Sequence, residues 1–229
     1  IRDQSSSRGL GDVYQRQGKD WQKDGVTIRE IGYSTDLITR ESVNIIKSSS
    51  RTNPFFLNVS YNAPHTPIET RQIDEKEEKN RSTYLEMIST LDYGIGQIVS
   101  ALEEEELLNQ TVIFFTSDNG GFSPAPWFVE LLIPPMRDGL ADNSPLLGGK
   151  GWPNEGGVRV PAAVWWAGKI ESEQPNQQVM HIADVLPTLA DLIGFDAGDI
   201  DGKSVLQPLV DGNLIPVSYT HLRAHETKT

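Results

Sequence analysis

The chain of 229 residues contains no cysteine. This absence excludes disulfide bonds and thiolate metal ligands, and it leaves the redox compartment open. Long apolar runs are also missing, since none approaches the roughly 20 residues that a membrane-spanning helix needs. Positive charge is scarce, with 20 lysines and arginines against 32 aspartates and glutamates and a formal net charge of -12. We therefore expect no nucleic-acid partner, because such proteins present a basic face.

One apolar segment stops abruptly at polar residues. Thr111 to Ser117 is rich in apolar and β-branched residues, and it predicts a fully buried strand of an α/β sheet. Asp118 and Asn119 follow directly, and two glycines come after them. Ligands of α/β sheets bind beyond the carboxyl ends of strands, and a carboxylate beside a carboxamide suits calcium. Taken alone, the motif is more typical of a plain Asn-Gly turn than of a metal site.

Two further segments carry residues that could act on an anion. Residues 55–61 predict a second strand, and they lead to His65, which could donate a proton near neutral pH. Lys150 lies in the glycine-rich segment 148–161, where backbone can approach a ligand closely and a lysine offers a compact positive charge. The plainer alternatives are that His65 only shapes a proline-rich turn and that Lys150 is an ordinary loop lysine.

Apolar periodicity predicts the remaining elements. We expect helices at 34–48, 82–108 and 181–193, a strand at 158–167 and a long loop at 119–157. Ser34 or Thr35 should cap the first helix. His181 and Asp184 have a spacing that a metal could use, but we interpret them as a helix start packed on the core. Arg159 should pair with an acid such as Glu155 or Asp138.

Together with Gly32-Tyr33-Ser34-Thr35-Asp36, these motifs resemble the sulfatase family in the same chain order. The likeness is closest to the arylsulfatase and N-acetylgalactosamine-sulfatase branch and runs from about Gly32 to Gly212. It implies an α/β, alkaline-phosphatase-like sandwich, in which helices flank a mixed, mostly parallel central sheet. Residues 1–198 would form the C-terminal half of the catalytic domain, and 199–216 would begin the connection to a smaller C-terminal domain.

The resemblance also implies a chemistry. Sulfatases hydrolyse sulfate esters, here of a sulfated glycan or an aryl sulfate, with calcium and a formylglycine nucleophile. Asp118 and Asn119 resemble the metal ligands, and Lys150 and His65 resemble the catalytic and substrate-binding residues. The nucleophile motif C/S-x-P-x-R is absent, because Ser5 to Arg8 and Ser48 to Arg51 lack its proline. We expect that motif upstream, and we expect this chain alone to be inactive.

Two other functions stay open, namely a phosphonate or phosphodiester hydrolase of the same superfamily and a catalytically dead sulfoglycan-binding relative. The sequence leaves the oligomeric state undetermined, and the resemblance implies a periplasmic, secreted or lysosomal protein. Residues 217–229 resemble no sulfatase segment. The run from Pro216 to Thr227 matches a translated reading frame of a common transposase sequencing adapter. We therefore expect 217–229 to be a non-native addition without ordered contacts.

Overall fold

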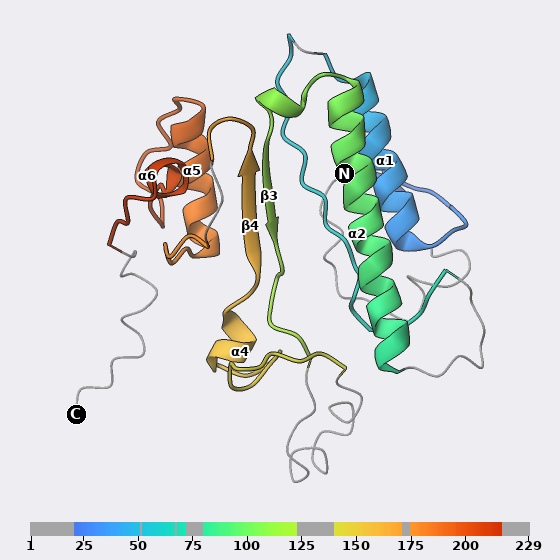
Figure 1. Cartoon of the computed structure of the whole chain (residues 1–229). Helices are drawn as coiled ribbons and strands as arrows, with labels where there is room; N and C mark the ends of the chain where they lie inside the picture. Colours follow the sequence, from blue (N-terminus) through green and yellow to red (C-terminus); the bar gives the residue numbers. More distant parts are fainter. Residues whose placement is uncertain are drawn as a thin grey trace. The chain divides into compact units, whose positions relative to one another are not determined.

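The chain divides into two compact units (Figure 1). The computed structural model describes residues 21–50, 52–66, 68–71, 80–122, 140–170 and 175–216. The first unit comprises Ile1–Leu108 and Thr116–Pro161, and the second comprises Asn109–Phe115 and Ala162–Thr229. The predicted non-native tail, 217–229, lies outside the described residues. No helix in the described part of the chain is long and apolar enough to cross a membrane.

Two long helices form the frame of the first unit. Helix α1 (Ser34–Ser48) and helix α2 (Arg81–Glu104) confirm the first two predicted helices, and they pack side by side (Figure 1). Helix α2 begins after Asn80, whose Oδ1 accepts hydrogen bonds from the amides of Ser82 and Thr83. Such a cap satisfies amides that the first helical turn leaves unpaired.

The predicted cap of α1 is wrong. Tyr33 occupies the N-cap position and makes no side-chain cap, while Ser34 and Thr35 are fully buried in the first turn. The reason lies in the packing of the preceding residue. The hydroxyl of Tyr33 donates to the carbonyl of Glu69 at 3.0 Å, and the Tyr33 ring belongs to the core of the unit. This contact brings the start of the helix inside, where Ser34 and Thr35 become interior residues.

The contact between α1 and α2 uses small and polar residues. The buried face of α2 includes Thr83, Met87, Thr90 and Gly94, whereas Leu85 on its apolar side is 48% exposed. Gly94 permits the close approach of the helices, because a Cβ there would lie 2.4 Å from Thr39 Oγ1. Helix α2 also ends earlier than predicted, at Glu104. Glu106 adopts a φ of 55°, and residues with positive φ do not continue a right-handed helix.

The segment 52–66 runs beside these helices as extended chain, so the predicted strand at 55–61 is wrong. A strand needs a hydrogen-bonded neighbour, and no described strand pairs with this segment. Phe56 is consequently 77% exposed. Side chains hold the segment instead, since the hydroxyls of Tyr61 and Thr39 share a hydrogen bond of 2.8 Å. The core cluster consists of Tyr33, Ala63, Ile68 and Met87, with Tyr84 and Leu140 packed against it.

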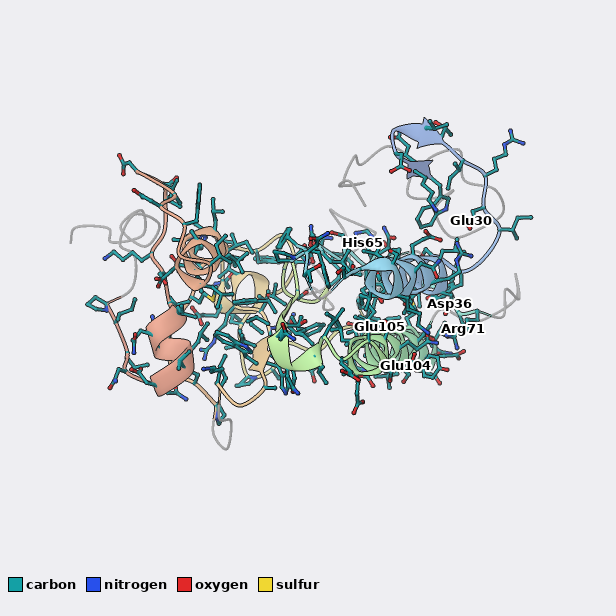
Figure 2. All side chains as sticks on the ribbon, turned by 90° about the horizontal axis from the view of Figure 1, so that it is seen from above. Glu30, Asp36, His65, Arg71, Glu104 and Glu105 are labelled. Carbon is teal, nitrogen blue, oxygen red and sulfur yellow. The ribbon has the colours of Figure 1, made fainter. Side chains whose placement is uncertain are left out.

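Two surface contacts complete the first unit. Strands β1 (Gln22–Lys23) and β2 (Val26–Thr27) form an antiparallel hairpin, whose turn at Asp24 and Gly25 has the two positive φ angles of a tight hairpin turn. Beyond the extended segment, the guanidinium of Arg71 donates to both carboxylate oxygens of Asp36 at 2.6 to 3.1 Å. Figure 2 shows these two side chains meeting at the start of α1.

The second unit pairs two strands with a group of short helices. Strands β3 (Val112–Thr116) and β4 (Ala162–Trp166) lie side by side and run in opposite directions (Figure 1). Helix α5 (Val185–Leu192) follows the short helix η4 (Ile182–Asp184), which confirms the third predicted helix, and α6 (Leu206–Asp211) packs against α5.

These strands confirm the α/β class and correct two expectations. The predicted strand at 111–117 forms, but it is half-buried to exposed instead of fully buried, and Phe115 is 43% exposed. In the described part of the chain each of these strands has one neighbour, so no sheet of several strands covers them. The strand predicted from Val158 begins only at Ala162, because Glu155–Val158 forms the short helix α4. The mostly parallel central sheet stays a prediction.

Candidate functional site

The turn after β3 holds two of the predicted site residues. The strand continues by one more bond, from the amide of Ser117 to the carbonyl of Pro161, and the chain then turns at Asp118 and Asn119. Ser117 Oγ donates to the carbonyl of Asn119 at 2.9 Å, and Asn119 Nδ2 donates to the carbonyl of Gly120 at 3.1 Å. The chain therefore bends after β3, with a carboxylate and an amide on the bend.

Lys150 lies in a loop that bonds directly to this turn. The amide of Lys150 donates to the carbonyl of Gly121 at 3.1 Å, and the amide of Gly120 donates to the carbonyl of Gly157 at 2.9 Å. We call these two contacting segments, 118–122 and 147–158, the glycine junction. A Cβ on Gly120 would lie 1.8 Å from the carbonyl oxygen of Gly156, so only glycine permits this approach.

Asn143 also joins the two segments, and the sequence analysis gave it no role. Its Oδ1 accepts from the amide of Gly121 at 2.9 Å, while its Nδ2 donates to the carbonyls of Gly121 at 2.9 Å and Gly148 at 3.1 Å. The sequence signal was slight. An asparagine two residues before a proline indicates a turn, but nothing in the sequence indicates which backbone groups it binds.

The charged groups at the junction are available to a ligand. The Asp118 carboxylate and the Lys150 ammonium make no ion pair with any described residue, and Asp118 is exposed. Asn119 uses its amide nitrogen on Gly120, which leaves the amide oxygen as its ligating atom. A carboxylate oxygen and an amide oxygen are ligand atoms of the type that a hard cation such as calcium binds. The described residues contain no cluster of three or more His, Cys, Asp or Glu, so they offer only part of a coordination shell.

His65 lies on the extended segment of the same unit, where Figure 2 labels it. Its amide donates to the carbonyl of Asn62 at 2.9 Å, and Ala63 and Ile68 on either side belong to the core cluster. Its Nδ1 lies 2.7 Å from the carbonyl oxygen of Thr66. A carbonyl only accepts, so Nδ1 carries the proton of that bond and the ring orientation is fixed. The meeting of His65 with the other three residues stays a prediction.

His181 and Asp184 form a helix start, as the sequence interpretation held. The amide of His181 donates to Asp184 Oδ2 at 2.7 Å, and the amide of Ala183 donates to His181 Nδ1 at 3.1 Å. Together these bonds make a reciprocal cap of η4. In the first unit, Arg159 pairs with Glu155 at 3.5 Å, which confirms one of its two predicted partners; Asp138 lies outside the described residues.

Comparison with known proteins adds a family and a set of relatives. The family described as Sulfatase matches residues 2–195. N-acetylgalactosamine-6-sulfatase of Homo sapiens is 32% identical over 190 residues, which cover 81% of this chain and 34% of that protein. Steryl-sulfatase of Homo sapiens is 32% identical over 181 residues, covering 78% and 30%. The chain thus spans about a third of the length of these relatives.

A solved structure shares the fold. The crystal structure of Ps i-CgsB superimposes with a TM-score of 0.69 and 32% identity, over 82% of this chain and 40% of that chain. A second structure of Ps i-CgsB, in complex with k-i-k-neocarrahexaose, gives a TM-score of 0.68. A similar protein of known structure therefore has the same fold.

Proposed function

Because this chain belongs to the sulfatase family, we propose that the whole protein hydrolyses sulfate esters, on a sulfated glycan or an aryl sulfate. The observation that carries the proposal is the glycine junction. It ties Lys150 to the turn of Asp118 and Asn119 through Gly121, so that an unpaired cation and two oxygen donors belong to one hydrogen-bonded unit. The complex of Ps i-CgsB with k-i-k-neocarrahexaose supports a glycan as the substrate.

Asp118 and Asn119 would hold a calcium ion through a carboxylate and an amide oxygen. When bound, calcium supplies positive charge that polarises the sulfuryl oxygens. The formylglycine nucleophile that the family resemblance implies has no matching motif in residues 1–229. The proposal therefore assigns the nucleophile to another segment of the whole protein, and it assigns binding and proton donation to this chain.

Lys150 and His65 carry those two roles. The Lys150 ammonium is a compact point charge, and it would bind the anionic sulfate oxygens as charge develops on them. His65 donates from Nδ1 to the Thr66 carbonyl, so Nε2 is the nitrogen that would meet the leaving oxygen, and it would donate its proton there from the doubly protonated ring. With this ring orientation fixed, His65 would matter most for substrates whose leaving alcohol is a poor leaving group.

Steady-state hydrolysis by the whole protein tests the proposal. The panel contains an aryl sulfate, a sulfated galactosamine oligosaccharide, an aryl phosphodiester and an aryl phosphonate. We expect turnover of the sulfates, and we expect Lys150→Ala to lower kcat/KM about a hundredfold. Lys169→Ala is the matched control, since that lysine belongs to the second unit. Residues 1–229 alone should show no turnover.

The other outcomes separate the remaining candidates. Faster turnover of the phosphodiester or the phosphonate than of both sulfates would make the protein a phosphonate or phosphodiester hydrolase. Binding of the sulfated oligosaccharide without turnover of any substrate would make it a sulfoglycan-binding relative. Equal activity of Lys150→Ala and Lys169→Ala would remove Lys150 from the site.

A further inference from the structure

We propose that Asn143 is a positioning residue of this reaction, which fixes Lys150 relative to the turn of Asp118 and Asn119. The inference rests on the proposed function for its catalytic consequence. Its structural basis is independent of that function, because it consists of hydrogen bonds within the first unit.

The Asn143 side chain uses both its donor and its acceptor groups within the protein. An asparagine amide offers two N–H donors and one oxygen acceptor. The Oδ1 atom of Asn143 accepts a hydrogen bond from the amide of Gly121, and its Nδ2 donates hydrogen bonds to the carbonyls of Gly121 and Gly148. All three partners are backbone groups, so the side chain has both of its donors engaged within the protein. This arrangement favours a structural link to the site over contact with a substrate.

These bonds converge on Gly121, where the two segments of the glycine junction meet. The Gly121 carbonyl accepts from two groups, Asn143 Nδ2 and the Lys150 amide, while its own amide donates to Asn143. Gly121 is two residues from Asn119 and three from Asp118. Gly121 therefore accepts from the Lys150 amide at its carbonyl, and its amide side continues into the proposed metal ligands. Asn143 bonds both the amide and the carbonyl of Gly121.

A glycine at this position needs hydrogen bonds from other residues to hold its conformation. A Cβ on Gly121 would lie 2.4 Å from the Cβ of Ala141, so a side chain at this position is excluded. Glycine backbone is the most conformationally free, and the junction is built from it. Lys150 adds a flexible stem of its own. A shift on the order of 1 Å in a residue that orients substrate can cost about a hundredfold in rate.

The experiment compares two substitutions of Asn143 with a matched control in the whole protein. Asn143→Ala removes the three hydrogen bonds. Asn143→Asp keeps the shape of the side chain, but it replaces the donor Nδ2 with an oxygen that faces two carbonyl acceptors. Asn176→Ala is the control, because Asn176 in the second unit also bonds backbone groups, with Nδ2 on the Pro208 carbonyl and Oδ1 on the Gln178 amide. We expect both Asn143 variants to lower kcat/KM about ten- to a hundredfold, and the control to lower it less than about twofold.

Coupling to Lys150 distinguishes positioning from a general loss of stability. If Asn143 acts through Lys150, adding Asn143→Ala to Lys150→Ala should lower activity by less than about threefold more, because coupled residues are not additive. The inference would be overturned if the activity losses of Asn143→Ala and Lys150→Ala multiplied in the double variant. It would also be overturned if Asn143→Ala and Asn176→Ala lowered activity equally. Asn143→Asp keeps the test valid if the alanine variant fails to fold.

Amide hydrogen exchange separates this inference from the proposed function. In Asn143→Asp the amides of Gly121 and Lys150 should exchange at least about tenfold faster, with the amide of Gly157 as an internal reference within the same junction. Faster exchange in a protein that does not hydrolyse sulfate esters would support the role of Asn143 in holding the two segments together, and it would reject the proposed function. Unchanged exchange at both amides would overturn that role of Asn143, whatever the protein hydrolyses.

Discussion

Asp118 and Asp184 are carboxylates at the ends of elements, yet their surroundings differ in every respect. Asp118 follows β3, is exposed and pairs with no described residue. Asp184 ends η4, is 2% exposed and has both oxygens occupied, by the amide of His181 at 2.7 Å and that of Lys203 at 2.9 Å. A buried carboxylate is tolerated only when its oxygens are bonded in this way.

The difference shows which acidic residue is available for chemistry. A carboxylate whose oxygens all accept backbone amides is a structural part of the chain, and a metal would have to displace those bonds. The spacing of His181 and Asp184 is compatible with a metal site, but the structure uses it for a cap. The Asp118 oxygens remain available at the glycine junction. Hydrogen-bond occupancy therefore separates the two roles where sequence spacing does not.

The largest effect should come from Asp118. In the whole protein, Asp118→Ala should lower kcat/KM about a hundred- to a thousandfold and weaken calcium binding, because it removes a charged ligand from the proposed site. The melting temperature without calcium should change by less than about 2 °C, since no described contact is lost. Activity assays, calcium titration by calorimetry and thermal unfolding measure the three quantities. A large fall in melting temperature with normal calcium binding would make Asp118, like Asp184, a structural carboxylate.

The next effect should come from Asp184, and it should concern stability. Asp184→Ala should lower the free energy of unfolding by about 3 kcal/mol, because it leaves two amides without their charged acceptor and removes the cap of η4. Urea unfolding followed by fluorescence measures this. Asp191→Ala is the control, since that exposed carboxylate of α5 accepts one side-chain bond, from Ser204 at 2.6 Å, and should cost less than about 1 kcal/mol. Equal losses in the two variants would contradict the distinction.

The sequence was sufficient for three helices whose hydrogen bonds close along the chain, although it placed the end of α2 too late. Apolar spacing predicted α1, α2 and α5, because a helix closes its hydrogen bonds within a few residues. It failed for 55–61, because a strand depends on a partner that the segment itself does not specify. It also failed for the cap of α1, where the bond from Tyr33 to Glu69 buries the start of the helix.

The same contrast between local and distant contacts applies to the candidate site. Motif order indicated Asp118, Asn119 and Lys150 as candidate residues, and the structure links their segments through Gly121. The role of Asn143 could not be predicted, because its partners lie up to 22 residues away and are backbone groups, which carry no signal of residue type. The pairing of Arg159 with Glu155, by contrast, was accessible, because residues four apart on a helical turn are neighbours.

The smallest effect should come from Glu41, a carboxylate that is ion-paired but not fully buried. It accepts from Lys23 at 3.1 Å and from Arg40 at 3.1 Å, while 28% of its side chain is exposed. The Lys23 hydrogen bond is the largest cause that lowers the pKa of Glu41 below its ordinary value. Because the folded-state pKa is lowered, this stabilisation is present above the ordinary pKa of a glutamate, about 4.3, and is lost as the pH falls below it.

Glu41→Gln should therefore cost only about 0.5 kcal/mol or less at pH 7, since water and salt screen exposed pairs. Urea unfolding of both proteins between about pH 3 and pH 7 measures the difference, which should shrink below about pH 4 and in about 1 M salt. Gln207→Ala is the control, because it removes one exposed side-chain bond, to Asp211, without changing the net charge. If Glu41→Gln instead costs as much as Asp184→Ala, ion pairing and not burial with bonded oxygens would distinguish the structural carboxylates of this protein.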